Sequence, residues 1–358
     1  MYCLVACIHT SLIKPKELRS IRISCLPYAV GQFCRSVKKY LMTQGIILSL
    51  GSVNADFQVR VDKKPGTTTT MLGHDFLRLS GGKAANVAYL ARKLGVQASL
   101  IAHVGKDDLQ EQALGSLQEM GVELRYVRAL EQETTGVSMI AVPEDGKKQI
   151  ILAANANDVW QHEDGDEVEK AIHQAPEGSV LVVDYEIAPF IVERAIVVAH
   201  KKGFLVLLDP SPADRVNQEL YPQINYMVPD ASETEDLTGI KPDTVSRAKE
   251  AALRLVELGI AHAVVKMEDG GCVAATQEEI LHIPAIQVEV VDATGAGDAF
   301  AGALAVALLE KRPLKEAACF ASAASQAAVT GYGSQPAYPD REGIGFYYKQ
   351  LITQTKKL

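Results

Sequence analysis

The chain has 358 residues, of which 47% are hydrophobic, so it is long enough for one large domain with a buried core and a small appendage. No apolar run reaches the roughly 18 residues that a transmembrane helix needs, and we expect none. The net charge of −8 argues against a nucleic-acid partner.

Residues 1–45 differ in composition from the rest of the chain. They hold seven Lys/Arg and one acidic residue, so they contribute +6 and the remainder carries −14. This composition is typical of an organellar transit peptide. Alternatively, the segment is not native coding sequence and Met42 is the true start. In either case we expect a poorly ordered, non-catalytic extension ahead of a domain that spans residues 46–358.

The six cysteines do not form a disulfide framework. Four of them lie in residues 1–45, and we expect Cys272 and Cys319 to be buried free thiols because their neighbours are apolar. Free thiols favour a reducing compartment, so we expect a cytoplasmic protein unless residues 1–45 target it to an organelle.

From residue 46 onward, apolar strands alternate with amphipathic helices. This order is typical of a parallel sheet covered by helices on both faces. The expected strands are 46–50, 99–104, 180–183, 204–208, 226–228 and 261–267. The expected helices are 83–94, 107–120, 189–202, 244–258, 295–310 and 314–329.

Two regions break the alternation. Residues 57–79 lack a helical period, and residues 122–152 contain short strand-like runs with a turn at Glu144-Asp145-Gly146. Together they are expected to form a small β-sheet flap.

The run Asp292-Ala-Thr-Gly-Ala-Gly-Asp-Ala-Phe300 carries the clearest chemical signal. A glycine-rich turn that leads into a helix leaves backbone N–H groups free to bind an anion such as a phosphate. Asp298 would repel that anion unless it takes part in the chemistry, which makes it the candidate general base. Gly295, Ala296 and Gly297 would supply the N–H groups. The alternative is an ordinary acidic residue in the first turn of a helix.

This run resembles the C-terminal signature of the ribokinase-like (PfkB) family of carbohydrate kinases. A second signature, Ser80-Gly-Gly-Lys-Ala-Ala-Asn86, lies upstream, and the resemblance extends from about residue 46 to the C-terminus. It implies a three-layer α/β/α sandwich with a mostly parallel central sheet. It also implies a small β-sheet lid over the sugar, which in many members forms a homodimer contact.

The resemblance assigns a first group of residues to the sugar. Asp56 would hold sugar hydroxyls, and a turn aspartate is its alternative. The other sugar-binding candidates are Gly82, Lys83, Asn86 and Glu186. An ordinary solvated first helical turn is the alternative for Lys83.

A second group is assigned to ATP and Mg²⁺. Asp230 and Glu233 match the family's Asn-x-x-Glu motif, in which Glu233 would hold Mg²⁺ through water, and a helix N-cap is the alternative. Lys266, Glu268 and Gly271 lie where the family's nucleotide site is found. Asp230 replaces the usual asparagine and Glu268 the usual glycine.

The resemblance also implies a monovalent-cation site. Its ligands would be Asp292 and backbone oxygens of Thr294, Ala328, Gly331 and Gly333, which suit K⁺. A helix C-cap with a left-handed glycine is the alternative for the loop.

Together these residues predict an ATP-dependent sugar kinase, with ribose as the best single substrate. The alternatives are 2-deoxyribose, fructose or a nucleoside as substrate, or a non-catalytic sugar- or nucleotide-binding protein on the same fold.

Overall fold

The structure, a computed structural model, describes residues 45–66 and 70–358. The extension expected at residues 1–45 therefore lies, except for Gly45, outside the described residues, as do its four cysteines. Cys272 and Cys319 are free and buried, as predicted.

A ten-stranded sheet forms the centre of residues 45–358, and its seven strands from β5 (Glu123–Leu130) to β11 (His262–Lys266) run parallel to one another. Strands β1 and β8 are fully buried, which explains their uninterrupted apolar sequences. The strand order is β14 (Lys356–Lys357), β13 (Ile280–Ile283), β12 (Cys272–Ala275), β11 (His262–Lys266), β10 (Tyr226–Met227), β9 (Leu205–Leu208), β8 (Val180–Val183), β1 (Ile47–Leu50), β4 (Ala98–Gly105) and β5 (Glu123–Leu130).

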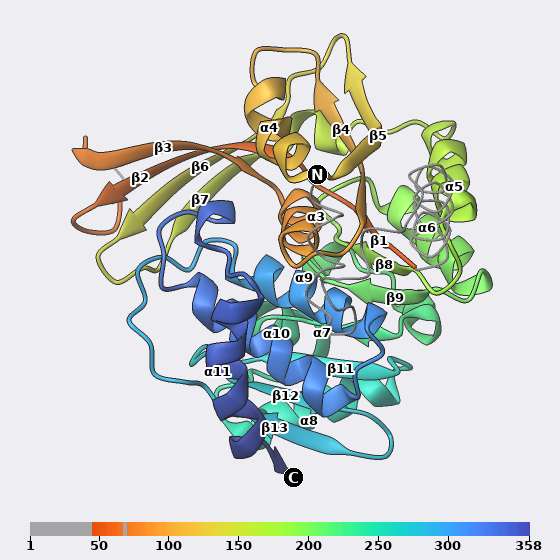
Figure 1. Cartoon of the computed structure of the whole chain (residues 1–358), viewed down its shortest axis with the longest axis vertical. Helices are drawn as coiled ribbons and strands as arrows, with labels where there is room; N and C mark the ends of the chain where they lie inside the picture. The colour runs from red at the N-terminus through yellow and green to blue at the C-terminus, as the bar shows by residue number, and fades with distance from the viewer. Residues whose placement is uncertain (1–44, 67–69) are drawn as a thin grey trace, which may run out of the picture. The chain divides into compact units, whose positions relative to one another are not determined.

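Helices cover both faces of this sheet, as expected from the alternating pattern (Figure 1). Side chains along a strand point alternately to the two faces, so Ile47 and Leu48 belong to two different hydrophobic clusters. One layer contains α3 (Lys83–Lys93), α4 (Gln110–Met120), α9 (Ala296–Leu309), α10 (Leu314–Ala328) and α11 (Arg341–Gln354); the other contains α5 (Asp164–Gln174), α6 (Pro189–Lys201) and α8 (Val245–Glu257). The short helix α7 (Ala231–Thr238) follows β10. Within the described residues, every helix is too short or too polar to span a bilayer.

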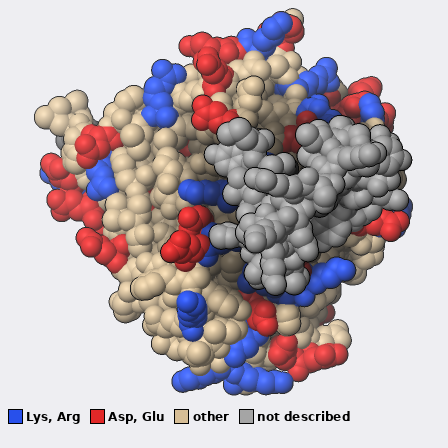
Figure 2. Space-filling view, in the orientation of Figure 1, with Lys and Arg blue, Asp and Glu red and all other residues tan. Residues whose placement is uncertain are grey.

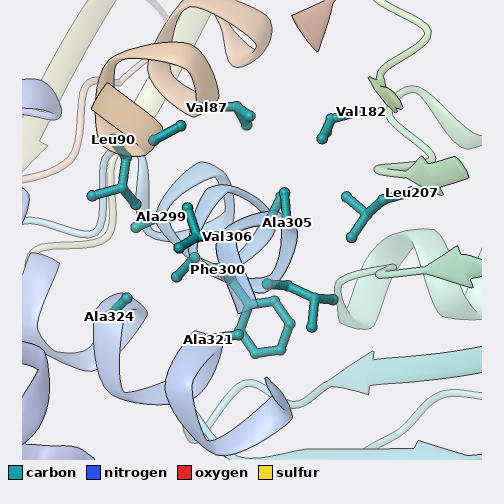
Figure 3. Close-up of a cluster of buried hydrophobic side chains, with 14 of the residues drawn as sticks. Val87, Leu90, Val182, Leu207, Ala299, Phe300, Ala305, Val306, Ala321 and Ala324 are labelled. Atoms are coloured by element: carbon teal, nitrogen blue, oxygen red, sulfur yellow. The ribbon is translucent and has the colours of Figure 1, made fainter. Parts of the chain in front are cut away.

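Helix α9 is buried on nearly all sides. Figure 3 shows its side chains between Val87 and Leu90 of α3, the strand residues Val182 and Leu207, and helix α10. Gly302 permits the close approach of α3, because a Cβ at this position would lie 3.3 Å from Leu90 Cδ2. The small side chains of α9 therefore set its distance from α3.

A second sheet of four strands forms the lid, and it lies at the left of Figure 1. Its order is β3 (Gly73–Gly81), β2 (Asn54–Val61), β6 (Gly136–Pro143) and β7 (Gln149–Ala153). Residues 57–61 and 73–79 of the first expected lid range and residues 136–143 and 149–152 of the second lie in this sheet, whereas the placement of residues 123–130 in the lid is wrong. That segment is β5, which pairs in parallel with β4 at the edge of the central sheet. An edge strand and a lid strand are both half-exposed, so their sequences look alike.

Candidate active site

A cavity of about 530 Å³ lies between the lid and the carboxyl ends of the parallel strands, where ligands bind in open α/β sheets. All of the predicted catalytic, sugar and nucleotide residues line it. They are Asp56, Gly82, Lys83, Asn86, Glu186, Asp230, Glu233, Lys266, Glu268, Gly271, Gly295, Ala296, Gly297 and Asp298.

The glycine-rich turn begins α9 as predicted. Gly295 is the N-cap residue with φ 74°, and a Cβ there would lie 2.6 Å from the hydroxyl of Tyr338, so the position requires glycine. The prediction is wrong for the N–H of Ala296, which donates to the carbonyl of Ala293 at 3.3 Å. The first helical turn leaves the N–H groups of Gly297 and Asp298 without intrahelical partners. The turn can therefore bind an anion at the wall of the cavity.

Asp298 is buried and is held by two residues of α3. Asn86 Nδ2 donates to Asp298 Oδ2 at 2.7 Å, and the ammonium of Lys83 lies 3.7 Å from Oδ1. Gln335 in turn donates to Asn86 Oδ1 at 3.0 Å and fixes the orientation of its amide. Asn86 therefore orients Asp298.

Lys83 also pairs with Asp209, which lies 3.3 Å from its ammonium at the end of β9. Burial lowers the pKa of Lys83, but the carboxylates of Asp209 and Asp298 outweigh burial and hold this pKa well above its usual value. Lys83 is therefore a fixed cation and not an ordinary solvated lysine. Sequence patterns do not indicate the Lys83–Asp209 pair, because its partners are 126 positions apart.

Two further carboxyl groups, those of Asp56 and Glu186, also line the cavity. Asp56 is part of strand β2 and not of a turn, since the strand already begins at Asn54. Burial raises the pKa of Asp56 to about 7, and the charges of Asp298 and Glu186 add to this effect. Glu186 follows β8 as expected and accepts a hydrogen bond of 2.6 Å from Ser52. Burial raises its pKa as well.

Asp230 and Glu233 form a capping box at the start of α7, which was the alternative considered for this motif. Asp230 Oδ1 accepts from the Glu233 N–H at 2.9 Å, and Glu233 Oε2 accepts from the Asp230 N–H at 2.8 Å. Both side chains still border the cavity. Burial, followed by the charge of Asp209, raises the pKa of Glu233 to about 7.

The far end of the cavity combines one lysine with an apolar wall. Lys266 ends β11, and its ammonium would lie 3.5 Å from a Cβ at Gly297, so it flanks the glycine-rich turn. Glu268 and Gly271 follow it. The apolar wall can cover a flat ring system and consists of Ile286, Val288, Val290, Phe300 and Val329.

Comparison with known proteins identifies this arrangement. Residues 46–341 match the model of the pfkB family of carbohydrate kinases. The chain belongs to this family. It is 31% identical to the ribokinase of Haemophilus influenzae over 295 residues, which cover 82% of this chain and 95% of that protein. It is 30% identical to the deoxyribokinase of Salmonella typhi over 302 residues, which cover 84% of this chain and 98% of that protein.

The structure of Arabidopsis thaliana ribokinase complexed with ribose and ATP is similar in fold, with a TM-score of 0.73 at 29% identity. The match covers 86% of this chain and 99% of that one. The expected three-layer ribokinase-like fold is thus confirmed, and the chain is an ATP-dependent sugar kinase.

The remaining predicted residues belong to the expected cation site, and two of them, Thr294 and Gly333, hydrogen-bond the carboxylate of Asp292. The carboxylate is fully buried, and its Oδ1 accepts from the N–H and hydroxyl of Thr294 at 2.8 and 2.6 Å. Its Oδ2 accepts from Gln58 at 2.7 Å and from the Gly333 N–H at 2.9 Å. Gly333 has φ 87° but is not the C-cap of α10, which is Val329. Ala328 is the last residue of α10, and its carbonyl accepts a hydrogen bond of 3.4 Å from the N–H of Gly331.

The raised pKa of Asp56 predicts a pH-dependent cost of folding. The unfolded chain ionises this carboxyl near 3.8 and the folded protein only near 7, so folding takes up a proton between these values. Stability is therefore lost as the pH rises through this window. We expect Asp56→Asn to raise the Tm of the sugar-free protein, relative to wild type, more at about pH 8 than at about pH 5.

Thermal unfolding by circular dichroism at both pH values measures this effect. Asp236→Asn, which removes an exposed carboxylate from α7, is the control and should show no such trend. A Tm difference that is independent of pH for Asp56→Asn would contradict the assignment.

Proposed function

We propose that the protein is a ribokinase that transfers the γ-phosphoryl group of ATP to ribose and forms ribose 5-phosphate. The observation that carries this proposal is the carboxylate of Asp298, which is placed in an anion-binding turn and aimed into the cavity by Asn86 and Lys83. Ribokinases among the most similar relatives and structures support ribose as the acceptor.

The chemistry requires a deprotonated acceptor hydroxyl. Asp298 takes the proton of the sugar hydroxyl as its oxygen attacks the γ-phosphorus, and the bond from phosphorus to the β-phosphate oxygen breaks to release ADP. Asp56 and Glu186 accept hydrogen bonds from other hydroxyls of the sugar and fix its orientation. Asn86 keeps Asp298 in place throughout.

Negative charge develops on the transferring group and on the leaving phosphate. The N–H groups of Gly297 and Asp298 and the ammonium of Lys266 lie around the same turn, so they can bind these oxygens. The apolar wall at the far end of the cavity holds the adenine.

Glu233 and Asp230 fit a Mg²⁺ ion that is bound mainly by phosphates and water. No group of three or more metal-ligating side chains occurs among the described residues, and Mg²⁺ in kinases commonly keeps its waters. When bound, the ion neutralises charge between the β- and γ-phosphates. The raised pKa of Glu233 fits this role, because a nearby cation would favour its ionised form.

The surroundings of Asp292 fit a K⁺ ion. Within residues 45–66 and 70–358, no cationic side chain lies within ion-pair distance of this buried carboxylate. Two buried oxygens near it, Gln58 Oε1 and Ser334 Oγ, also have no hydrogen-bond partner. Asp292, Ser334 and carbonyls of Thr294, Ala328, Gly331 and Gly333 would hold the ion, and its charge would stabilise the loop behind Gly295.

The substrate panel that tests this function contains ribose, 2-deoxyribose, fructose and nucleosides, each with ATP and Mg²⁺. The deoxyribokinase relative makes 2-deoxyribose the second candidate. We expect ribose to give the highest kcat/KM in an ADP-release assay. A higher value for another acceptor would replace ribose, and no ADP release with any acceptor would indicate a binding protein.

We also propose that two copies of the chain pair through the outer face of the lid. Phe57, Met139 and Ile151 are register partners on adjacent strands, with side chains on the face opposite to Asp56 and Ser138. Ile151 is 73% exposed, Phe76 60% and Met139 59%. An apolar sheet face of this kind marks an interaction surface.

Pairing of this kind predicts that Ile151→Glu shifts the protein from dimer to monomer, because a charge cannot be buried without a partner. Light scattering after size-exclusion chromatography measures the mass. Phe346→Glu, at an exposed aromatic residue of α11, is the matched control and should leave the mass unchanged. A monomeric wild-type protein, or a dimeric Ile151→Glu variant, would contradict the proposal that two copies pair through the outer face of the lid.

We do not propose nucleic acid as a partner. Figure 2 shows Lys and Arg interspersed with Asp and Glu over the described part of the face in view. Residues 46–358 carry a net charge of −14. The buried free thiols Cys272 and Cys319 favour a reducing compartment such as the cytoplasm.

Asp298→Asn should nearly abolish turnover while sugar and ATP still bind. The amide has the shape of the carboxylate but cannot accept the proton, and loss of a general base typically lowers the rate about 10²–10⁴-fold. Steady-state kinetics gives kcat, and calorimetric titration gives the Kd of each substrate. A variant that keeps more than about half of the wild-type kcat would remove Asp298 from the mechanism.

Activity should rise with K⁺ but not with Na⁺ or Li⁺, because an ion beside Asp292 would fix the turn that carries Gly295 and Gly297. Small displacements of such an anion site are costly in rate. Initial rates in KCl, NaCl and LiCl at constant ionic strength, with saturating ATP, Mg²⁺ and sugar, measure the effect. Equal rates in all three salts would exclude a selective K⁺ site.

A further inference from the structure

The turn between lid strands β6 and β7 is seated on the loop that precedes the glycine-rich turn. The carbonyl of Gly146 accepts a hydrogen bond of 3.2 Å from the N–H of Ala293. Gly146 has φ 69°, and a Cβ there would lie 2.9 Å from Val290 Cγ1, so a larger residue would lift the turn away. The lid thus contacts the chain three residues before the anion-binding α9 begins.

Lys148 follows this turn and makes a second contact with the same residue. Its Nζ donates to the carbonyl of Ala293 at 3.2 Å, and the side chain lines the cavity together with Gly297 and Asp298. A lysine ammonium has three N–H donors, so two remain after this bond. No carboxylate in the described residues lies within ion-pair distance of it.

The three lysines that border the cavity are not equivalent. Lys83 is paired with Asp209 and Asp298, so its charge is largely balanced inside the protein. Lys148 and Lys266 have no carboxylate partner within the parts of the chain that the structure describes. They flank the anion-binding turn at Ala293 and at Gly297 respectively.

Resting on the proposed kinase function, we propose that Lys148 is a further catalytic residue, whose ammonium is delivered by the lid turn and hydrogen-bonds the transferring phosphoryl group. The bonds made and broken are those of the proposed transfer, with the hydroxyl proton going to Asp298. Lys148 keeps its own proton and stabilises the oxygens whose charge changes during transfer. Burial lowers the pKa of Lys148 and the charge of Asp298 opposes this, so an incoming phosphate would hold the ammonium in its charged form.

A purely structural role is the competing explanation, because the bond to Ala293 could simply hold the lid in place. The two roles differ in which ligands of the cavity a Lys148 variant would bind more weakly. A lid tether would affect every ligand of the cavity alike. A contact to the transferring group would matter most for a complex that mimics the transition state, and least for ADP, which lacks that group.

The test compares Lys148→Met and Lys148→Arg with Lys63→Met, which removes an exposed lysine beyond the end of β2. In the full chain, kcat and the KM values are measured with the best sugar of the substrate panel, so an incorrect sugar assignment does not affect the outcome. The rise in Tm is then measured for ADP with Mg²⁺ and sugar, without and with aluminium fluoride as the phosphoryl mimic.

Lys148→Met should lower kcat by at least about tenfold, since loss of one such donor typically costs about 10²–10³. It should keep the stabilisation by ADP and sugar but lose the additional stabilisation by aluminium fluoride. Lys148→Arg should recover part of both effects, and Lys63→Met should match wild type. A loss in kcat of less than about tenfold, or equal loss of both stabilisations, would overturn the proposal.

Discussion

The chemistry of this protein depends on how closely helices α3 and α9 pack, because residues of α3 hold the carboxylate that begins α9. Asn86 and Lys83 reach Asp298 over 2.7 and 3.7 Å. Gly302 and the neighbouring alanines let the two helices approach so closely that Leu90 fits against α9. A larger residue at Gly302 would move Asp298 relative to both partners. Displacements of this size are costly in a reaction that depends on placement.

The cavity also contains more negative charge than a phosphate site tolerates without compensation. One acid that lines the cavity, Asp230, occupies a position where the family resemblance leads one to expect asparagine, and a second acid, Asp209, lies beside Lys83 at the end of β9. The structure supplies each with a partner: Lys83 for Asp209, and the start of α7 for Asp230. Each of the two carboxylates therefore has a hydrogen-bond partner within the protein. The departure from the family pattern at Asp230 is therefore compatible with ATP binding.

Much of the fold was predictable from residues 46 onward, because buried parallel strands are continuous apolar runs and surface helices have a clear period. The active-site turn was predictable for a related reason. Gly295, Gly297 and Asp298 lie within four positions, so their joint meaning is visible without knowledge of the fold.

The remaining features depend on contacts between distant positions. Lys148 lies 145 positions from Ala293, and only the Glu144-Asp145-Gly146 turn before it indicated that region. The ion pair between Lys83 and Asp209 likewise joins separate elements. The same holds for the hydrogen bond from Asn86 to Asp298. Strand β5 was placed in the lid, since its pattern of burial does not reveal which sheet it joins. Sequence patterns reveal local conformation, whereas partner choice is decided by packing.

A crystal structure of the protein with ribose and a non-hydrolysable ATP analogue would show whether Asp298 faces the acceptor hydroxyl. We predict that one sugar hydroxyl lies within about 2.6–3.2 Å of an Asp298 carboxylate oxygen, which is the reach of a general base. We also expect the γ-phosphate to face the N–H groups of Gly297 and Asp298. A bound sugar whose hydroxyls all lie beyond hydrogen-bond reach of Asp298, with the γ-phosphate away from the turn, would contradict it.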